Sequence, residues 1–469
     1  MSAAMPDAAS ESGLPPGLLL TYYGDDFTGS TDAMEVMAAA GLPTVLFLRP
    51  PEPAMLQRFP TLRCIGMAGS SRGRSPQWMT AQLPQAFSQL AALRAPLLQY
   101  KVCSTFDSSP AIGSIGRAID LGVPHMSAHW SPMIIGAPRL KRYQLFGNLF
   151  AAVDGVGHRL DRHPTMSRHP VTPMAEADLR RHLALQTQRR IQLVDMLQLR
   201  EAGAGGDQCM ARIKGADTPV VLIDVLDEET LREAGRLVWE HRGAGLFSAS
   251  SSGLQYALTA YWRARGWIAA QTGLPVAAAV PVIAAVSGSC SPVTAAQIAW
   301  ARQHGFAVER LDLRTVLSSH GRAAELTRQV TLATQAVQAG RSPLVFSAEG
   351  PDDPDVTGFD AIARQAGYRR EDAARLVGTA LAEIMQRLLD VCPITRLVIA
   401  GGDSSGEVAS ALDIAALSVC AAMTPGAPLC RAWSDNPHRD GLEVVLKGGQ
   451  IGPRSFFGDV LEGKPLGAS

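Results

Sequence analysis

The sequence predicts an α/β protein with two domains built from mostly parallel sheets, and three observations carry this prediction. The chain has 469 residues, too many for one compact core, so two or three domains are expected. Short apolar segments alternate with helical segments, as is typical of parallel α/β sheets. A stretch rich in Ala, Gly and Pro at 269–279 separates two such series and is the best candidate for a domain boundary.

The first series is assigned to an N-terminal domain over 18–268. Its expected elements are a strand at 18–23, a helix near 31–40, strands at 45–48, 62–67, 97–102 and 220–224, a helix at 228–240 and a strand at 245–249. Between 131 and 173 the pattern is irregular, which indicates a functional or disordered loop. Residues 1–17 have no basic or apolar region of a signal peptide, and we expect a disordered lead-in.

The second series is assigned to a C-terminal domain over 280–469. Strands are expected at 280–286, 307–311, 344–347, 396–400 and 442–446, with helices at 293–304, 372–389 and after residue 405. We expect two separate sheets joined by a short linker, which imply a cleft between the domains, and such clefts are common substrate sites.

Composition excludes several classes of protein. The formal net charge is zero, with 43 basic and 43 acidic residues, so neither a nucleic-acid nor a membrane partner is indicated. Seven scattered cysteines without a Cys-x-x-Cys pair argue against disulfides and structural zinc and indicate a reducing compartment. The most apolar stretch, 274–286, is too short to span a bilayer. We therefore expect a cytoplasmic protein.

Three turns of small residues follow expected strands of the C-terminal domain, at 287–292, 401–406 and 447–452. Small residues let backbone N–H groups approach a phosphate. Each turn alone is more simply an ordinary strand-to-helix loop. The carboxyl ends of parallel strands share one edge of a sheet, so the three together favour a nucleotide site.

Two adjacent carboxylates, Asp25 and Asp26, end the first strand of the N-terminal domain. Adjacent side chains of an extended segment point in opposite directions, so we expect only one to face a ligand. Such a carboxylate could accept a proton from a substrate hydroxyl or bind Mg²⁺. The alternative is that one of them caps the following helix.

Cations stand at two further strand ends of this domain. Arg72 follows the strand at 62–67, and Lys101 precedes a turn that contains Thr105 and Asp107. Arginine can hold a carboxylate in a two-pronged geometry. The alternatives are solvated strand ends for the cations and turn roles for Thr105 and Asp107.

The densest His and Arg segment lies at 159–173 and includes His169. His-Pro pairs in a loop give no sign of convergent ligands, so we prefer an anion- or hydroxyl-binding loop to a metal site. We assign no metal ligand. The alternative here is a helix cap at Thr172.

Taken together, these motifs resemble the four-carbon acid sugar kinase family over nearly the whole chain. The N-terminal half carries Asp-Asp-Phe-Thr-Gly, Ser-Ser-Arg, Lys-x-x-Ser-Thr-Phe-Asp-Ser and His-Pro-x-Thr-Pro-Met, and the C-terminal half carries Ser-Gly-Ser-Cys-Ser, Gly-Gly-acid-Ser-Ser-Gly and Lys-x-Gly-x-x-Gly. The resemblance implies a sugar-acid-binding N-terminal domain and a nucleotide-binding C-terminal domain. It implies nucleotide contacts at Ser289, Ser291, Gly401, Gly402, Asp403, Ser404 and Gly449. Asp403-Ser404 stands where the family usually has Glu-Thr.

The resulting hypothesis is an ATP- and Mg²⁺-dependent kinase that phosphorylates a small sugar acid such as a tetronate or 3-oxo-tetronate. The substrate would bind at Asp25, Arg72, Lys101, Thr105 and His169, with its carboxylate on Arg72 and Lys101. Asp26 or Asp107 would be the catalytic base. Phosphoryl transfer is catalysed mainly by positioning and charge neutralisation.

Two alternatives come from other classes. One is a sugar-acid-binding regulatory protein that has lost transfer but kept the fold. The other is a hydrolase with Ser251 or Ser291 as nucleophile, which we disfavour because no nucleophile-elbow motif is present. A homodimer is left open.

Overall fold

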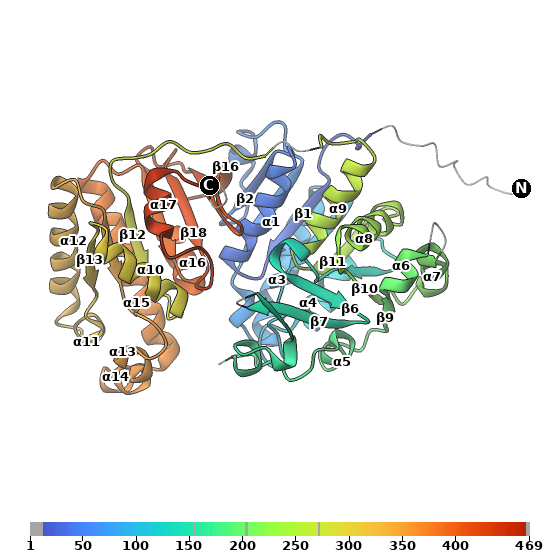
Figure 1. The fold of residues 1–469 in the computed structure, drawn as a ribbon, viewed down its shortest axis with the longest axis horizontal. Coiled ribbons are helices and arrows are strands. Elements are labelled where there is room, and N and C mark those ends of the chain that lie inside the picture. Colours follow the sequence, from blue (N-terminus) through green and yellow to red (C-terminus); the bar gives the residue numbers. More distant parts are fainter. Residues whose placement is uncertain (1–12, 154, 170, 202–204, 271–272, 466–469) are drawn as a thin grey trace, which may run out of the picture.

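The computed structural model describes residues 13–153, 155–169, 171–201, 205–270 and 273–465, and the side chains of 402–405 are outside the described part. Most of the predicted lead-in, residues 1–12, is also outside it. The two-domain α/β class is confirmed (Figure 1).

The N-terminal domain contains five parallel strands of the main sheet, in the order β11-β4-β1-β3-β2. These strands are β1 (Leu20–Gly24), β2 (Thr44–Phe47), β3 (Cys64–Ala68), β4 (Leu97–Lys101) and β11 (Leu246–Ser250). Their larger helices are α1 (Phe27–Ala39), α3 (Pro76–Ala92), α4 (Ile115–Gly122), α8 (Glu228–Glu240) and α9 (Gly253–Ala264). Shorter ones are α2 (Pro53–Leu56), α5 (Leu179–Ala184), α6 (Met196–Arg200) and α7 (Gly205–Ile213).

The C-terminal domain continues the same sheet, in the order β16-β17-β18-β15-β12-β14-β13. Its strands are β12 (Ala284–Ser287), β13 (Ala307–Arg310), β14 (Pro343–Phe346), β15 (Arg396–Ala400), β16 (Ala416–Thr424), β17 (Ala427–Trp433) and β18 (Glu443–Lys447). Its helices are α10 (Pro292–Gln303), α11 (Leu313–Leu317), α12 (Arg322–Gln338), α13 (Pro354–Thr357), α14 (Phe359–Gln365), α15 (Arg370–Val391), α16 (Gly402–Ala411) and α17 (Phe456–Glu462).

The expectation of two separate sheets is wrong, because the β16–β17 hairpin joins the two halves into one 12-stranded sheet. The hairpin strand β16 pairs antiparallel with β2 through Ala416 opposite Phe47 and Leu417 opposite Leu46. The other hairpin strand, β17, pairs antiparallel with β18. The join is short, and nothing in the sequence of β2 indicates a partner so far along the chain.

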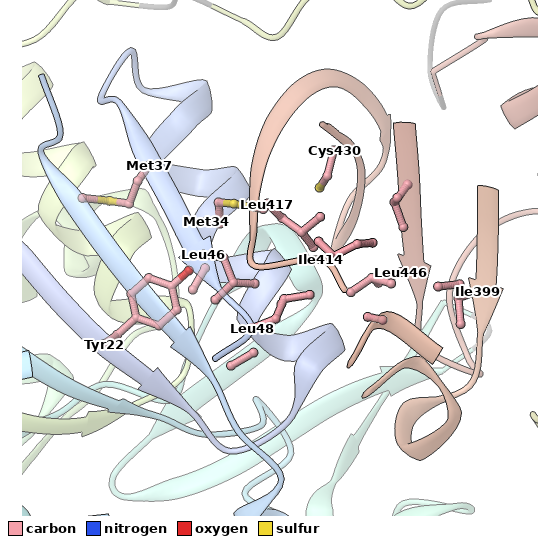
Figure 2. Packing of buried hydrophobic residues seen from close by; sticks show 14 of the residues in the cluster. Tyr22, Met34, Met37, Leu46, Leu48, Ile399, Ile414, Leu417, Cys430 and Leu446 are labelled. Carbon is pink, nitrogen blue, oxygen red and sulfur yellow. The ribbon is translucent and has the colours of Figure 1, made fainter. Parts of the chain in front are cut away.

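The hydrophobic core also continues across this join (Figure 2). Leu46 and Leu48 from the N-terminal domain belong to the same buried cluster as Leu417, Ile414 and Leu446 from the C-terminal domain. All five side chains are at most 7% exposed. The shared apolar core therefore fixes the two domains relative to each other, in addition to the chain connection that precedes β12.

The segment at 131–173 is more regular than expected. It contains β5 (Ser131–Met133), which joins β9 (Ile191–Val194) and β10 (Val220–Ile223) in a small parallel sheet. It also contains an antiparallel sheet of β6 (Arg142–Leu145), β7 (Asn148–Val153) and β8 (Val156–Arg159). Most of these strands have only three or four residues, and β8 is largely exposed, so their sequences show no clear alternation.

Candidate active site

The carboxyl end of β1 carries a compact cluster of charges. Arg72 donates from Nε and Nη2 to the two oxygens of Asp25, at 3.1 and 2.8 Å. The same guanidinium donates from Nη1 and Nη2 to the two oxygens of Asp26, both at 2.8 Å. One arginine thus holds two carboxylates in two-pronged geometry.

The expectation that Asp25 and Asp26 face opposite ways is wrong, because both converge on Arg72. Asp26 is no longer part of the strand: it is the N-cap of α1 and accepts the N–H of Gly29 at 2.8 Å. The capping alternative is therefore confirmed for Asp26. A Cβ at Gly29 would lie 2.4 Å from Asp26 Oδ1 and 2.6 Å from Lys101 Nζ, so glycine keeps this cluster compact.

The two adjacent carboxylates have pKa values shifted in opposite directions. Burial raises the pKa of Asp25, and Arg72 only partly opposes this shift. Burial would also raise the pKa of Asp26, but the charges of Arg72 and Lys101 outweigh it and that pKa is lowered. Paired carboxylates with separated pKa values are characteristic of sites that perform acid–base chemistry.

Asp32, on the next turn of α1, belongs to the same cluster. Its Oδ2 lies 3.9 Å from Lys101 Nζ, and its Oδ1 is buried without a hydrogen-bond partner among the described residues. Burial raises the pKa of this carboxyl. Asp32 was not predicted as a site residue, although its position one turn into a helix that starts directly after Asp26 could have indicated it.

The turn after β4 forms a second polar group beside this cluster. Thr105 Oγ1 donates to Asp107 Oδ1 at 2.7 Å, and Cys103 Sγ lies 2.9 Å from the same hydroxyl. The charges of Arg72, Lys101 and Asp25 all act on the Cys103 thiol, so this turn adjoins the charge cluster. The positions of Thr105 and Asp107 are thus compatible with the predicted substrate contacts.

His169 makes local contacts instead. Its Nδ1 accepts the backbone N–H of Thr172 at 3.1 Å and lies 3.1 Å from the Thr172 hydroxyl. No hydrogen bond joins His169 to the Asp25 cluster within the described ranges. Its assignment to the substrate stays a prediction.

The three small-residue turns of the C-terminal domain, which were predicted to bind a nucleotide, lie together at one edge of the sheet. The strand ends are held in register, with Gly288 N–H bonded to Ala400 O at 3.0 Å and Gly401 N–H bonded to Lys447 O at 2.8 Å. A Cβ at Gly449 would lie 2.8 Å from Ser289 Oγ and 3.0 Å from Ser291 Cβ. The predicted contact residues Ser289, Ser291 and Gly449 are therefore neighbours.

The third turn opens with Gly401, whose φ of 124° favours glycine. Gly402 begins α16 directly after it. Backbone N–H groups at the start of a helix are suited to anions. The side chains of Asp403 and Ser404 lie outside the described residues.

Lys447 is a buried residue that the sequence analysis did not single out. Its ammonium donates to Gly448 O at 2.9 Å and to Thr294 Oγ1 at 3.0 Å. Burial lowers the pKa of Lys447 to about 7. An apolar strand ending in lysine before two glycines was the available signal.

The two groups of loops meet. Thr28, whose hydroxyl donates to Asp26 Oδ2 at 2.9 Å, lies 3.8 Å from the position of a Cβ at Gly448. A Cβ at Gly406 would touch the Phe27 ring at 2.8 Å. The N-terminal charge cluster and the C-terminal glycine turns are therefore in contact across the domain boundary.

No group of three or more His, Cys, Asp or Glu side chains that could hold a metal ion occurs in the described part of the chain. Within that same part, no helix combines the length and apolar character needed to cross a bilayer.

The sequence matches two family models. Residues 20–258 match a sugar-binding N-terminal domain, and residues 284–457 match a nucleotide-binding C-terminal domain. The chain belongs to the family that combines these two domains, and the predicted resemblance to the four-carbon acid sugar kinases is confirmed.

Individual relatives extend over nearly the whole chain. A 3-oxo-isoapionate kinase from Paraburkholderia graminis is 70% identical, covering 97% of this chain and 96% of the relative. A 3-oxo-tetronate kinase from Methylobacterium radiotolerans is 29% identical, covering 95% and 99%. A solved structure from Salmonella typhimurium LT2 superimposes with a TM-score of 0.74 at 25% identity and covers 93% of this chain and 97% of its own.

Proposed function

We propose that this protein is an ATP-dependent kinase that phosphorylates a 3-oxo sugar acid, with 3-oxo-isoapionate as the first candidate substrate. The predicted class, a sugar-acid kinase, is confirmed by its curated relatives, which are named kinases of 3-oxo sugar acids. The observation that carries the proposal is the close approach of Thr28 in the charge cluster to Gly448 in the glycine turns, where a Cβ on Gly448 would lie 3.8 Å from the Thr28 hydroxyl. This approach brings the Asp26 carboxylate, the candidate acid–base group, close to the glycine turns proposed to bind the phosphates.

On the acceptor side, Asp26 is the better candidate for the base. It accepts from Thr28, which lies near the turn at Gly448, whereas Asp107 accepts from Thr105 within the turn after β4. The lowered pKa of Asp26 keeps it ionised at neutral pH. Arg72 holds it in place through two hydrogen bonds, and the positive charges of Arg72 and Lys101 act on it.

On the nucleotide side, backbone N–H groups of the turns at Ser289 and Gly449 and at the start of α16 supply donors for the phosphates. The Lys447 ammonium donates hydrogen bonds to the carbonyls of Gly448 and Gly449, which fixes the conformation of the turn. This arrangement serves the positioning and charge stabilisation on which phosphoryl transfer depends.

Mg²⁺ is expected to arrive with ATP. It is commonly bound by one or two carboxylates together with substrate phosphates. The Asp26 carboxylate, exposed by 15% and beside Thr28, has the right chemistry to supply one ligand. When bound, the ion would neutralise charge on the phosphates.

A kinetic assay tests the proposal. Purified protein is given ATP, Mg²⁺ and one acid at a time from 3-oxo-isoapionate, 3-oxo-tetronates, threonate and erythronate, and ADP is measured with the phosphorylated acid. We expect acid-dependent ADP formation, fastest with a 3-oxo acid. Acid binding without any turnover would instead favour the regulatory alternative.

Substitution separates the two candidate bases. Asp26→Asn should lower kcat by about 10²–10⁴-fold, the usual contribution of a general base. Asp107→Asn should retain a larger share of kcat. The reverse order would assign the base to Asp107. The homodimer and the cytoplasmic location stay predictions.

A further inference from the structure

The cations nearest the proposed base already face carboxylates. Arg72 is held by Asp25 and Asp26, and Lys101 lies 3.9 Å from Asp32. Three carboxylates against two cations give this cluster a formal charge of −1. A substrate carboxylate placed there would meet net repulsion, so the donor for it should be sought in the adjoining loops.

Arg142, at the start of β6, is a cation without a carboxylate partner among the described residues. Its Nη1 donates to the backbone carbonyls of Leu140 and Lys141 at 3.1 and 3.3 Å. Its Nε is buried and has no hydrogen-bond partner within the described ranges. A buried guanidinium N–H left unpaired is costly unless an anion completes it.

The small antiparallel sheet gathers other donors around Arg142. Arg142 lies opposite Ala151, which lies opposite His158 on the next strand. Directly opposite residues share one face of a sheet, so Arg142 and His158 flank the small, buried Ala151 on that face. The ring of His163 lies 5.9 Å from the ring of His158. Arg142, His158 and His163 therefore form one polar group beside Ala151.

His163 is a hydrogen-bond donor in this group. Its Nδ1 accepts the backbone N–H groups of Thr165 and Met166, each at 3.2 Å, so its ring proton is on Nε2. Burial, with the charges of Arg142 and His158, lowers its pKa. The neutral imidazole therefore offers Nε2–H, for which the described residues provide no acceptor.

Arg142 lies near the turn at 103–107, which adjoins the charge cluster. The charges of Cys103 and Asp107 both act on Arg142, although no carboxylate lies within salt-bridge distance of it in the described part. Cys103 is in turn influenced by Arg72 and Lys101. The turn at 103–107 is thus near enough to both Arg142 and the Asp25 cluster for their charges to act on it.

We propose that Arg142, with the Nε2–H of His163, binds the carboxylate of the sugar acid, while the hydroxyl to be phosphorylated lies at Asp26. The inference rests on the proposed function and deepens it, because it orients the substrate. Arg142 selects an acid over an uncharged sugar, and the turn at Thr105 and Asp107 contacts the middle of the molecule.

The test compares Arg142→Gln, His163→Gln and a control, Arg139→Gln, which alters an exposed arginine of the same segment paired with Glu228. Each is assayed with the sugar acid that the wild type uses best and with the methyl ester of that acid. Arg142→Gln should raise KM for the acid about 10–100-fold and abolish the preference for acid over ester. KM for ATP should not change, and Arg139→Gln should match the wild type.

The outcomes are distinguishable. If the wild type phosphorylates no sugar acid, the proposed function fails and this inference fails with it. If the wild type is active and folded Arg142→Gln keeps its KM and its preference for the acid, only the carboxylate assignment is overturned. If Arg142→Gln does not fold, His163→Gln decides: a several-fold rise in KM for the acid, with KM for the ester unchanged, supports the inference, and an unchanged KM for the acid refutes it.

Discussion

Replacing Arg72 by methionine would test the charge cluster that organises the proposed site. The change removes four hydrogen bonds of 2.8–3.1 Å and leaves Asp25 and Asp26 without their guanidinium. Their side chains are only 3% and 15% exposed. Removing one partner of a buried ion pair costs about 3–5 kcal/mol. Because Arg72 itself is 25% exposed, we expect a loss near the lower end, about 3 kcal/mol.

The loss should depend on pH in a defined direction. Without Arg72, burial raises the carboxyl pKa values above those of the unfolded chain. A carboxyl with a raised pKa lowers stability as pH rises through the interval between the two values. The deficit of Arg72→Met relative to the wild type should therefore be larger at pH 7 than at pH 5.

Urea unfolding at the two pH values measures this deficit. Arg74→Met is the control, because Arg74 is exposed and its guanidinium lies over the Trp78 ring at 5.4 Å; we expect a change below about 1 kcal/mol. Combining Arg72→Met with Asp25→Asn should restore part of the stability, because it removes one unpaired charge. A deficit below 1 kcal/mol, independent of pH, would refute the reasoning.

Three further predictions concern the contacts between and within the domains. Glu35 accepts the N–H of Gly426 at 2.8 Å, and burial raises its pKa to about 8. The stability that the protonated Glu35 contributes is therefore lost as pH rises from about 4.5 to 8. In urea unfolding, Glu35→Gln should have a free energy of unfolding about 2–4 kcal/mol above that of the wild type at pH 8 but little different at pH 5. An equal difference at both pH values would contradict the pKa shift. Burial lowers the pKa of Lys447, so the unfolded chain binds this proton more tightly and the stability of the wild type should rise between pH 7 and 9 relative to that of Lys447→Met. Thermal unfolding that shows no such trend would contradict the lowered pKa. Gly449→Ala places a Cβ 2.8 Å from Ser289 Oγ and should raise KM for ATP at least about tenfold, which is a loss of roughly 1.4 kcal/mol of binding free energy. The control Gly13→Ala, whose Cβ would have nothing within 4 Å, should leave KM for ATP unchanged. Equal KM values for the two variants would exclude Gly449 from the nucleotide site.

Much of the fold could be predicted from the sequence, because apolar strands and helix periodicity are local signals. The helix at 228–240 and the strand at 396–400 were predicted with the bounds that the structure has. The β16–β17 hairpin was missed, although it joins the sheets, because its pairing with β2 depends on residues more than 350 positions apart. The small sheet at β6–β8 was missed because strands such as Val156–Arg159 bury little.

The candidate site was predicted in part for a related reason. Turn motifs indicate which residues reach an edge of the sheet, so Asp26, Arg72 and Gly449 could be named in advance. The ion-pair partners of these arginines could not be predicted, because they depend on tertiary contacts: Arg72 holds both aspartates, whereas Arg142 holds no carboxylate of the described residues. Arg142 lies in a segment interpreted as irregular loop, so its position on a strand was hidden.

The most direct test of the central claim is a crystal structure with ADP and the preferred sugar acid bound together. We expect the β-phosphate of ADP to lie against the turns at Ser289 and Gly449, and the acceptor hydroxyl to lie within hydrogen-bonding distance of Asp26. A nucleotide bound away from these turns, or a sugar acid whose hydroxyls all lie far from Asp26, would contradict it.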